Sequence, residues 1–352
     1  MRTTTVTESV RLPEGSELLE ILRLSAGEGV ATHLLAGPLL APLRDFLARP
    51  GKNFRGRLVE LGFLLGLPDR GRAGLTEVEI QLCQALAEIL EAIHAGSLIV
   101  DDIQDGSRLR RGDETLHRRY GTPVALNAGN FLYFLPLQRL HGLGLDPKTE
   151  LAAARLCHET LLRAHMGQAI DLGTRIDQVE RTEVEAVCLA SLQLKSGALM
   201  ALALTLGALV AGASQETLNE LDAFGHQFGV ALQMFDDIGN LVADPSLPPE
   251  QTKRFEDLYL RRPSWVWGAA SRLLDSRDYG QLVDAVRRLP NESFLIPWIE
   301  VHQFVPRARE LAREWLDTSL RNWIDRMGQD AESLPAVVAI RELAWKVANA
   351  YG

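Results

Sequence analysis

Cysteine is scarce in this chain, and no two cysteines have the spacing of a metal or redox motif. The three cysteines, Cys83, Cys157 and Cys188, are far apart within 352 residues. This distribution argues against a disulfide framework and against a thiolate zinc site. It is typical of a reducing compartment, so we expect a cytoplasmic location.

The chain also lacks an excess of positive charge and lacks long apolar runs. Asp and Glu number 46 against 37 Lys and Arg, a formal charge of −9, so binding to nucleic acid is not expected. The longest uncharged apolar run, residues 196–212, is rich in Ala and Gly. It falls just short of the roughly 18 residues that a spanning helix needs, so we expect a core helix and no transmembrane segment. Residues 1–15 lack the apolar core of a secretory signal and are expected to form a flexible lead-in.

Strand signals are scarce, whereas helical spacing recurs along the chain. Apolar residues repeat three and four positions apart from Leu18 to Val347, which is the period of amphipathic helices. Residues 77–105 and 216–242 are apolar on more than one side and should lie inside a bundle. We predict an all-α fold, a large helical bundle around a central apolar cavity, with one domain over residues 16–352. All six tryptophans lie beyond residue 260, so a separate C-terminal unit is the alternative.

Two clusters of polar oxygen donors follow apolar helical runs. The first contains Asp101, Asp102 and Asp105, and at ~3.6 residues per turn these carboxylates converge on one edge of a helix. The segment ALQMFDDIGN repeats the spacing 135 residues later with Asp236, Asp237 and Asn240. Oxygen ligands suit Mg²⁺, which bridges carboxylates to substrate phosphates. The sequence predicts a magnesium site that uses both clusters, and a solvated acidic helix end is the alternative for either cluster alone.

Cationic side chains accompany the first cluster. Arg110 and Arg111 follow it by a few residues, and Lys52, Arg55 and Lys195 lie close to glycines in PGKNFRGR and LKSG. Cations around a metal cluster indicate an anion that carries several phosphates. Neither PGKNF nor GLGLDP has the glycines of the usual phosphate loops, so side chains and metal would have to bind the phosphates.

These motifs together resemble the all-trans isoprenyl diphosphate synthase family, and most closely its eukaryotic-type geranylgeranyl diphosphate synthases. The matching segments lie between residues 50 and 267 and are PGKNFRGRL, ILEAIHAGSLIVDDIQDGSRLRRGDETLHRRYGTPVALNAGNFLYF, HMGQAIDL, QLKSG and LQMFDDIGNL. Five segments in the family's order are far more specific than one D-D-x-x-D. The resemblance implies the isoprenoid synthase fold. It also implies a magnesium-dependent prenyltransferase that condenses isopentenyl diphosphate with an allylic diphosphate.

The resemblance further implies roles for individual residues. Three magnesium ions would be held by Asp101, Asp102, Asp105, Asp236, Asp237 and Asn240. The allylic diphosphate would contact Arg110, Lys195, Ser196, Gln233 and Arg262. Isopentenyl diphosphate would contact Lys52, Arg55, His94 and Arg111. Catalysis of the ionisation would rest on Asp101, Asp102, Asp105, Arg110, Lys195 and Asp236.

Two segments depart from the family pattern. Asn240 replaces the last aspartate of the second motif. The segment FEDLYLRRPSWVWGAA carries Arg261 and Arg262 where the family has Gly-Lys, and Val266 where it has proline. The covering segment over the allylic diphosphate is therefore altered. The alternative function is therefore a terpene synthase that ionises and cyclises a prenyl diphosphate. The residues implied to bind isopentenyl diphosphate are retained, which argues against this alternative.

Product length in the family is limited by side chains just before the first aspartate cluster, here Gly96 and Ser97. Both are small, so the growing chain should pass them, with Phe131, Tyr133 and Phe134 as a deeper floor. We therefore expect a C20 product, geranylgeranyl diphosphate. The helices around the first motif are too apolar to face water on any side, so we also expect a homodimer.

Overall fold

The computed structural model describes residues 10, 12, 32–50, 54–242, 254–328 and 330–350, which are mostly helical. The only strands among them are β1 (Leu109–Arg110) and β2 (Asp113–Glu114), which pair antiparallel. The all-α prediction is confirmed. The chain divides into two compact units, unit 1 (Met1–Leu161 with Leu202–Leu218) and unit 2 (Leu162–Ala201 with Asn219–Gly352). A single domain over residues 16–352 stays a prediction.

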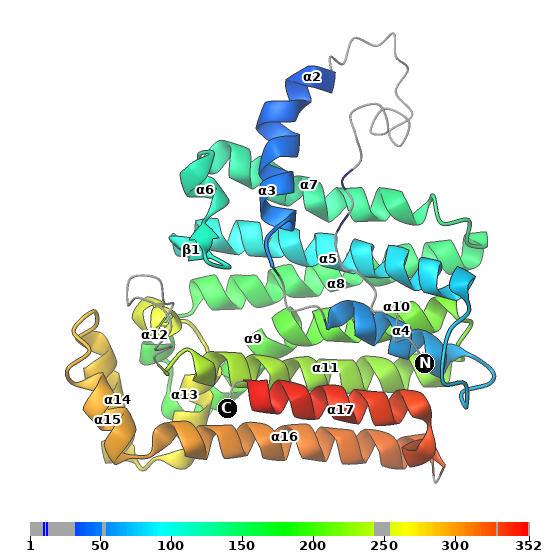
Figure 1. Cartoon of the computed structure of the whole chain (residues 1–352). Helices are drawn as coiled ribbons and strands as arrows, with labels where there is room; N and C mark the ends of the chain where they lie inside the picture. The colour runs from blue at the N-terminus through cyan, green and yellow to red at the C-terminus, as the bar shows by residue number, and fades with distance from the viewer. Residues whose placement is uncertain are drawn as a thin grey trace. The chain divides into compact units, whose positions relative to one another are not determined.

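Unit 1 is organised around a pair of long helices that run side by side, α5 and α7 (Figure 1). Its elements are α2 (Thr32–Leu35), the π-helix η1 (Ala36–Leu40), α3 (Ala41–Leu47), α4 (Arg55–Gly66), α5 (Glu77–Asp105), β1, β2, α6 (Leu116–Arg119) and α7 (Thr122–Leu140). Phe46 of α3, Ile99 of α5 and Leu132 of α7 are fully buried in one apolar cluster. This cluster anchors the end of α5 that carries the first aspartates.

Unit 2 is built largely from the second half of the chain. Three helices contribute residues to both units, α8 (Pro147–Gly173), α10 (Ala198–Val210) and α11 (Gln215–Gly239). Unit 2 also contains η2 (Ile176–Gln178), α9 (Arg181–Leu192), the π-helix η3 (Gln193–Gly197), α12 (Glu256–Leu260), α13 (Trp265–Leu273), α14 (Ser276–Arg287), α15 (Leu295–Val301), α16 (Phe304–Met327), η5 (Ala331–Ser333) and α17 (Pro335–Ala350). Within it α9 packs on α13, and α16 runs beside α17 (Figure 1).

Helix α5 has clear signals at both ends. At its start the Thr76 hydroxyl accepts from the Glu79 amide at 3.4 Å, and the Glu79 carboxylate accepts from the Thr76 amide at 2.7 Å. This is a capping box, which satisfies amides that have no partner inside the helix. At its end Gly106 adopts a left-handed conformation with φ of 65°, which glycine does without steric cost. The last turn of α5, with its three aspartates, is therefore fixed in place.

Two helical segments, Glu77–Asp105 and Arg181–Val210, are long and apolar enough to cross a membrane by length and composition alone. The most apolar window of each is 56% buried inside the protein, which is also true of core helices, so they are weak evidence for a span. The prediction of a core helix within residues 196–212 is confirmed, because Leu202, Leu204 and Leu206 of α10 are buried.

Candidate active site

The first aspartate cluster lies in the last turn of α5. Asp102 is 1% exposed, and Asp101 and Asp105 are half-buried. The backbone dipoles of a helix place partial negative charge at its C-terminus, so carboxylates there are disfavoured unless a cation offsets them. No Lys, Arg or His occurs in this last turn of α5. The cluster therefore needs positive charge from elsewhere.

Arg110 supplies part of that charge. Its Nε donates to Asp102 Oδ1 at 2.8 Å, its Nη2 lies 2.5 Å from the same oxygen, and Nη2 lies 3.5 Å from Asp101 Oδ2. The structure thus brings these three predicted residues together. Asp102 is held mainly by this ion pair, whereas Asp101 is more open to solvent. The predicted roles as metal ligands stay predictions.

Arg110 and Arg111 are presented by the β1–β2 hairpin. Its turn residues Arg111 and Gly112 have φ of 56° and 80°, the left-handed pair that two-residue hairpin turns require. Arg111 is not glycine, so its backbone is held in a sparsely populated region. The Arg111 Nη1 donates to the carbonyl of Arg49 at 3.4 Å. The hairpin therefore fixes two consecutive arginines by different contacts.

A second group of cations lies near α5 in the same unit. Arg55 of α4 forms a forked ion pair with Glu91, at 2.6 and 3.1 Å, and both side chains are nearly buried. Burial and the charges of Arg55, Arg111 and Arg110 hold the pKa of His94 well below its ordinary value. Burial and the charge of Arg55 also lower the pKa of Arg111. Such crowded cations around a neutral imidazole favour a bound anion. Lys52, the fourth residue predicted for this group, lies outside the described residues.

The residues predicted to set product length have a different environment from the one expected. A Cβ on Gly96 would lie 2.8 Å from the Gly129 carbonyl and 3.1 Å from Leu132 Cβ, so glycine is needed here for the close packing of α5 on α7. Phe134 is 70% exposed, and its expected place in a deep floor is wrong for the described chain. Ser97 is half-buried, and its hydroxyl donates to the His94 carbonyl at 2.8 Å. Phe131 and Tyr133 are also half-buried, and a Cβ on Gly96 would lie 3.4 Å from Tyr133 Cδ1. The roles of Ser97, Phe131 and Tyr133 in product length stay predictions.

The second cluster lies in the last turn of α11, in unit 2. Asp237 is 3% exposed, and both its carboxylate oxygens accept hydrogen bonds, Oδ1 from Gln233 Nε2 at 2.8 Å and Oδ2 from the Trp265 amide at 2.6 Å. The Ser196 hydroxyl in turn donates to Gln233 Oε1 at 2.7 Å. The backbone amide of Asn240 donates to the Asp236 carbonyl at 3.0 Å. Asp237 thus links α11 to α13, which was not foreseen from its place in the motif.

Lys195 and Ser196 lie on the π-helix η3, where one extra residue widens the helical turn. A Cβ on Gly229 would lie 2.4 Å from the Ser196 carbonyl, and a Cβ on Gly197 would lie 3.0 Å from the His226 carbonyl. Glycines therefore let η3 and α11 approach closely. Single π-turns of this kind are frequent at functional sites.

Two acidic residues that the sequence analysis did not assign complete this part of unit 2. Asp171 Oδ2 lies 3.3 Å from Lys195 Nζ and 3.7 Å from Arg262 Nε. Loss of hydration, then repulsion from Asp171, raises the pKa of Asp257 to about 7. Two sequence signals were available. HMGQAIDL contains Asp171 and comes close to Lys195 and Arg262 only in the folded chain, whereas FEDL contains Asp257 and precedes Arg262 within the segment FEDLYLRR. The structure thus gathers Lys195, Arg262, Asp171 and Asp257.

The altered covering segment has a left-handed backbone conformation at the position where the family has glycine. Arg261, at the position of the family's glycine, has φ of 58°, the left-handed conformation that glycine adopts most easily. Its Nη2 donates to the Val286 carbonyl at 3.2 Å, and the Arg262 Nη1 donates to the Asp171 carbonyl at 3.0 Å. Val266, at the family's proline position, is buried in α13. Arg262 can therefore stand where the family has lysine.

The donor set fits a hard divalent cation. Among the described residues no three His, Cys, Asp or Glu side chains group closely enough to hold an ion. Mg²⁺ can bind with only one or two protein ligands, because it keeps several waters and takes substrate phosphates as further ligands. Both acidic clusters lie at helix C-termini, and burial and neighbouring carboxylates raise the pKa values of Asp237 and Asp257. A bound cation would offset both effects.

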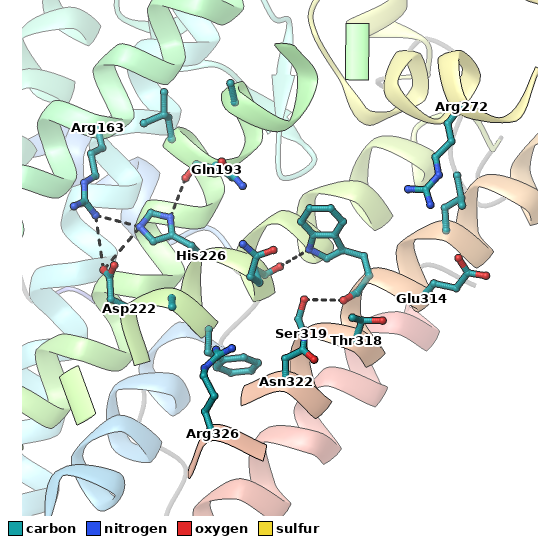
Figure 2. Close-up of a pocket in the computed structure, with 17 residues that line it drawn as sticks. Arg163, Gln193, Asp222, His226, Arg272, Glu314, Thr318, Ser319, Asn322 and Arg326 are labelled. Carbon is teal, nitrogen blue, oxygen red and sulfur yellow. Dashed lines mark hydrogen bonds and ion pairs between the residues drawn. The ribbon is translucent and has the colours of Figure 1, made fainter. Parts of the chain in front are cut away.

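A separate concave region of about 990 Å³ in unit 2 lies among α8, α9, α11, α13 and α16, and no residue predicted from the sequence lines it. Figure 2 shows His226 between Arg163 and Gln193. The His226 Nδ1–H donates to the Gln193 carbonyl at 3.3 Å, and Nε2 accepts from Arg163 Nη1 at 3.1 Å. Burial lowers the pKa of His226, which agrees with this neutral form. Gln193 is the first residue of η3, so His226 supports the π-helix that carries Lys195.

Comparison with known proteins identifies relatives. A family model described as polyprenyl synthetase matches residues 37–294. A geranylgeranyl pyrophosphate synthase of Penicillium janthinellum is 34% identical over 219 residues, covering 62% of this chain and 54% of that protein. One from Dictyostelium discoideum is 32% identical over 222 residues, covering 62% and 65%. The chain thus spans between half and two thirds of the lengths of these relatives. The crystal structure of a geranylgeranyl pyrophosphate synthetase from Pyrococcus horikoshii superposes with a TM-score of 0.70 at 19% identity, over 95% of this chain and 94% of that one.

Proposed function

Because the chain belongs to the polyprenyl synthetase family, we propose that it is a magnesium-dependent trans-prenyltransferase that condenses isopentenyl diphosphate with an allylic diphosphate. One observation carries this proposal above all. In unit 1, Arg55 pairs with Glu91, three residues before His94 on α5, and the hairpin holds Arg110 on Asp102 and Arg111 on the Arg49 carbonyl. The charges of these arginines help to hold the pKa of His94 below its ordinary value. A cyclase needs one diphosphate site, whereas a condensing enzyme needs a second anion site, and this group of cations is suited to one.

The proposed reaction begins with the break of the allylic C–O bond, whose electron pair leaves with the diphosphate. Magnesium, when bound, supplies the positive charge that stabilises the leaving diphosphate. Fixed cations beside the leaving oxygens stabilise the developing charge most. The resemblance to the family gives this role to Arg110 in unit 1 and to Lys195 and Arg262 in unit 2. The allylic carbocation then takes the electrons of the isopentenyl double bond, and one proton leaves. No side chain is assigned as the base, because the released diphosphate can accept that proton.

The aspartates divide into two proposed roles. Asp101, Asp105 and Asp236 would bind magnesium directly, as the resemblance to the family implies, and each lies in the last turn of its helix. Asp102 and Asp237 would act mainly by holding Arg110 and Gln233 in place. Asn240 would contribute its amide oxygen, and the number of three ions belongs to the same proposal.

We propose a C20 product, geranylgeranyl diphosphate, because the relatives from Penicillium janthinellum and Dictyostelium discoideum are geranylgeranyl pyrophosphate synthases. Ser97 is the residue to which we assign the length control, because its small side chain lies one turn before Asp101 on α5. We also propose a cytoplasmic homodimer. Exposed apolar side chains of α7 and of the unit 1 part of α8 support it, since Leu126, Phe134 and Leu151 are between 41% and 70% exposed. Light scattering at micromolar concentration would test the dimer.

One incubation tests the proposed activity. Purified protein, Mg²⁺ and farnesyl diphosphate are combined with and without isopentenyl diphosphate, and both diphosphates and hydrocarbons are analysed. A C20 diphosphate that forms only with isopentenyl diphosphate is the expected result. A cyclic hydrocarbon that forms without isopentenyl diphosphate would replace the proposal with the terpene synthase alternative.

A further inference from the structure

Asp45 of α3 joins two arginines from distant parts of unit 1. Its Oδ1 accepts from Arg49 Nη2 at 3.0 Å and Nε at 3.3 Å, and its Oδ2 accepts from Arg119 Nη1 at 2.7 Å. The Arg49 side chain is 4% exposed and that of Asp45 is 14% exposed. Burial opposes the charge of Asp45, but the bonds from Arg119 and Arg49 lower its pKa below the ordinary value. Asp45 is therefore a well-satisfied carboxylate at the centre of a small network.

The network reaches both strands of the β1–β2 hairpin. On the β1 side the Arg49 Nη1 donates to the Arg110 carbonyl at 3.3 Å, and Arg111 returns a bond to the Arg49 carbonyl at 3.4 Å. On the β2 side the Arg119 Nη2 donates to Asp113 Oδ1 at 2.5 Å. Asp45 holds both arginines, so one carboxylate ties the two strands to α3.

Phe46 reinforces the same arrangement. The guanidinium carbons of Arg49 and Arg111 lie 5.6 and 5.7 Å from the centre of its ring, within the range of cation–π attraction. Phe46 is fully buried, so it is a fixed support. Arg111 is thus held by a carbonyl and by an aromatic ring that both belong to the segment around α3.

The hairpin needs such support. Each strand has only two residues, and a short two-stranded hairpin is marginal at best by itself. Arg111 also has φ of 56°, and unfavourable backbone conformations of this kind persist only where surrounding contacts fix them. Arg110 has its own ion pairs with the α5 aspartates, whereas Arg111 contacts the Arg49 carbonyl and the Phe46 ring.

We infer that Asp45 and Arg49 are positioning residues that hold Arg111 for the diphosphate of isopentenyl diphosphate. The inference rests on the proposed function. Because Arg110 keeps its aspartates when the network is cut, the loss should fall on the isopentenyl diphosphate site and much less on the allylic site. General damage to the fold would affect both substrates alike.

Two variants break the network, one at its centre and one at its exposed edge, and a third variant leaves it intact. Asp45→Asn removes the central charge. Arg119→Met acts at a side chain that is 35% exposed, so folding should tolerate it. Arg118→Ala is the matched control, because Arg118 pairs with Glu114 of the same hairpin at 3.2 Å without contacting Asp45. Michaelis constants for both substrates and hydrogen exchange of residues 109–114 are measured in each.

Asp45→Asn should raise the Michaelis constant for isopentenyl diphosphate about tenfold, and Arg119→Met about threefold to fivefold, with the allylic constant changed less than twofold. Amide exchange in residues 109–114 should accelerate in both variants and not in Arg118→Ala.

The inference is overturned if both Michaelis constants rise together, or if Arg118→Ala has the same effect. If the wild type forms no product, the proposed function fails, and titration with inorganic pyrophosphate takes the place of kinetics. Unchanged pyrophosphate affinity in both network variants would then refute the positioning role by itself.

Discussion

The buried pair of Arg55 and Glu91 allows a quantitative test of unit 1. The two side chains are 8% and 11% exposed and meet through two hydrogen bonds of 2.6 and 3.1 Å. Replacing Glu91 with Leu leaves the Arg55 guanidinium buried without its carboxylate. Removal of one partner of a buried ion pair typically costs about 3–5 kcal/mol. Since ~1.4 kcal/mol is a tenfold change, the folding equilibrium should shift by roughly two to three and a half orders of magnitude.

The double variant Arg55→Met/Glu91→Leu removes both charges. It therefore separates the cost of losing the ion pair from the cost of leaving the Arg55 charge buried without a partner. Apolar side chains of similar volume often replace a buried ion pair at little cost, so the double variant should recover most of the stability. The assay is urea unfolding followed by circular dichroism. All six tryptophans lie beyond residue 260 and hence in unit 2, so fluorescence follows that unit separately. A Glu91→Leu variant within about 1 kcal/mol of wild type, or a double variant no more stable than it, would refute the reasoning.

Three further outcomes follow from the site. The depressed pKa of His94 means that its neutral form is favoured by folding, so stability should be full above about pH 6.5 and fall as the pH drops below it. His94→Gln should reduce that pH dependence in urea titrations at pH 7.5 and 5.5, and an unchanged dependence would exclude His94 as its source. His226→Ala should raise the allylic Michaelis constant severalfold by loosening η3, whereas His226→Asn, which keeps a donor for the Gln193 carbonyl, should be close to wild type; equal effects would contradict the support role. Ser97→Phe should shorten the product to fifteen carbons, with overpacking that costs about 1–3 kcal/mol, and an active variant with an unchanged product would place length control elsewhere.

Local sequence signals predicted the helices and both acidic clusters. The apolar period over residues 77–105 gives the bounds of α5 as observed, because Thr76 and Gly106 provide start and stop signals that depend only on nearby residues. The sequence also placed Arg110 near the first aspartate cluster, but its ion pairs with Asp101 and Asp102 come from the structure. Contacts within about ten residues are accessible to this kind of reasoning.

Contacts between distant segments were not accessible. Nothing in the periodicity of α9 and α10 marks η3 as a π-helix, since its extra residue is fixed by close packing against Gly229 of α11. Gly96 was interpreted as an opening for the product, but the Gly129 carbonyl on α7 accounts for its small size. Asp257 was passed over because the Asp171 carboxylate that perturbs it belongs to another helix.

Both acidic clusters occupy the helix end where carboxylates are least favourable, and this leads to a test that separates function from stability. Asp236 lies in the last turn of α11, next to the buried Asp237 and within electrostatic reach of Asp257. Asp236→Asn keeps the shape of the side chain and removes one negative charge from that end. We expect turnover to be lost, while the ligand-free protein becomes more stable by about 0.3–1 kcal/mol.

Asp317→Asn on α16 is the control, because it removes a charge from the interior of a helix, where the dipole has little effect. Stability is measured by urea unfolding without Mg²⁺ and again with Mg²⁺ and pyrophosphate, which should stabilise the wild type and not Asp236→Asn. A variant that is less stable than wild type without ligand would show that Asp236 is retained for the fold, and equal stabilisation of both proteins by Mg²⁺ and pyrophosphate would remove Asp236 from the metal site.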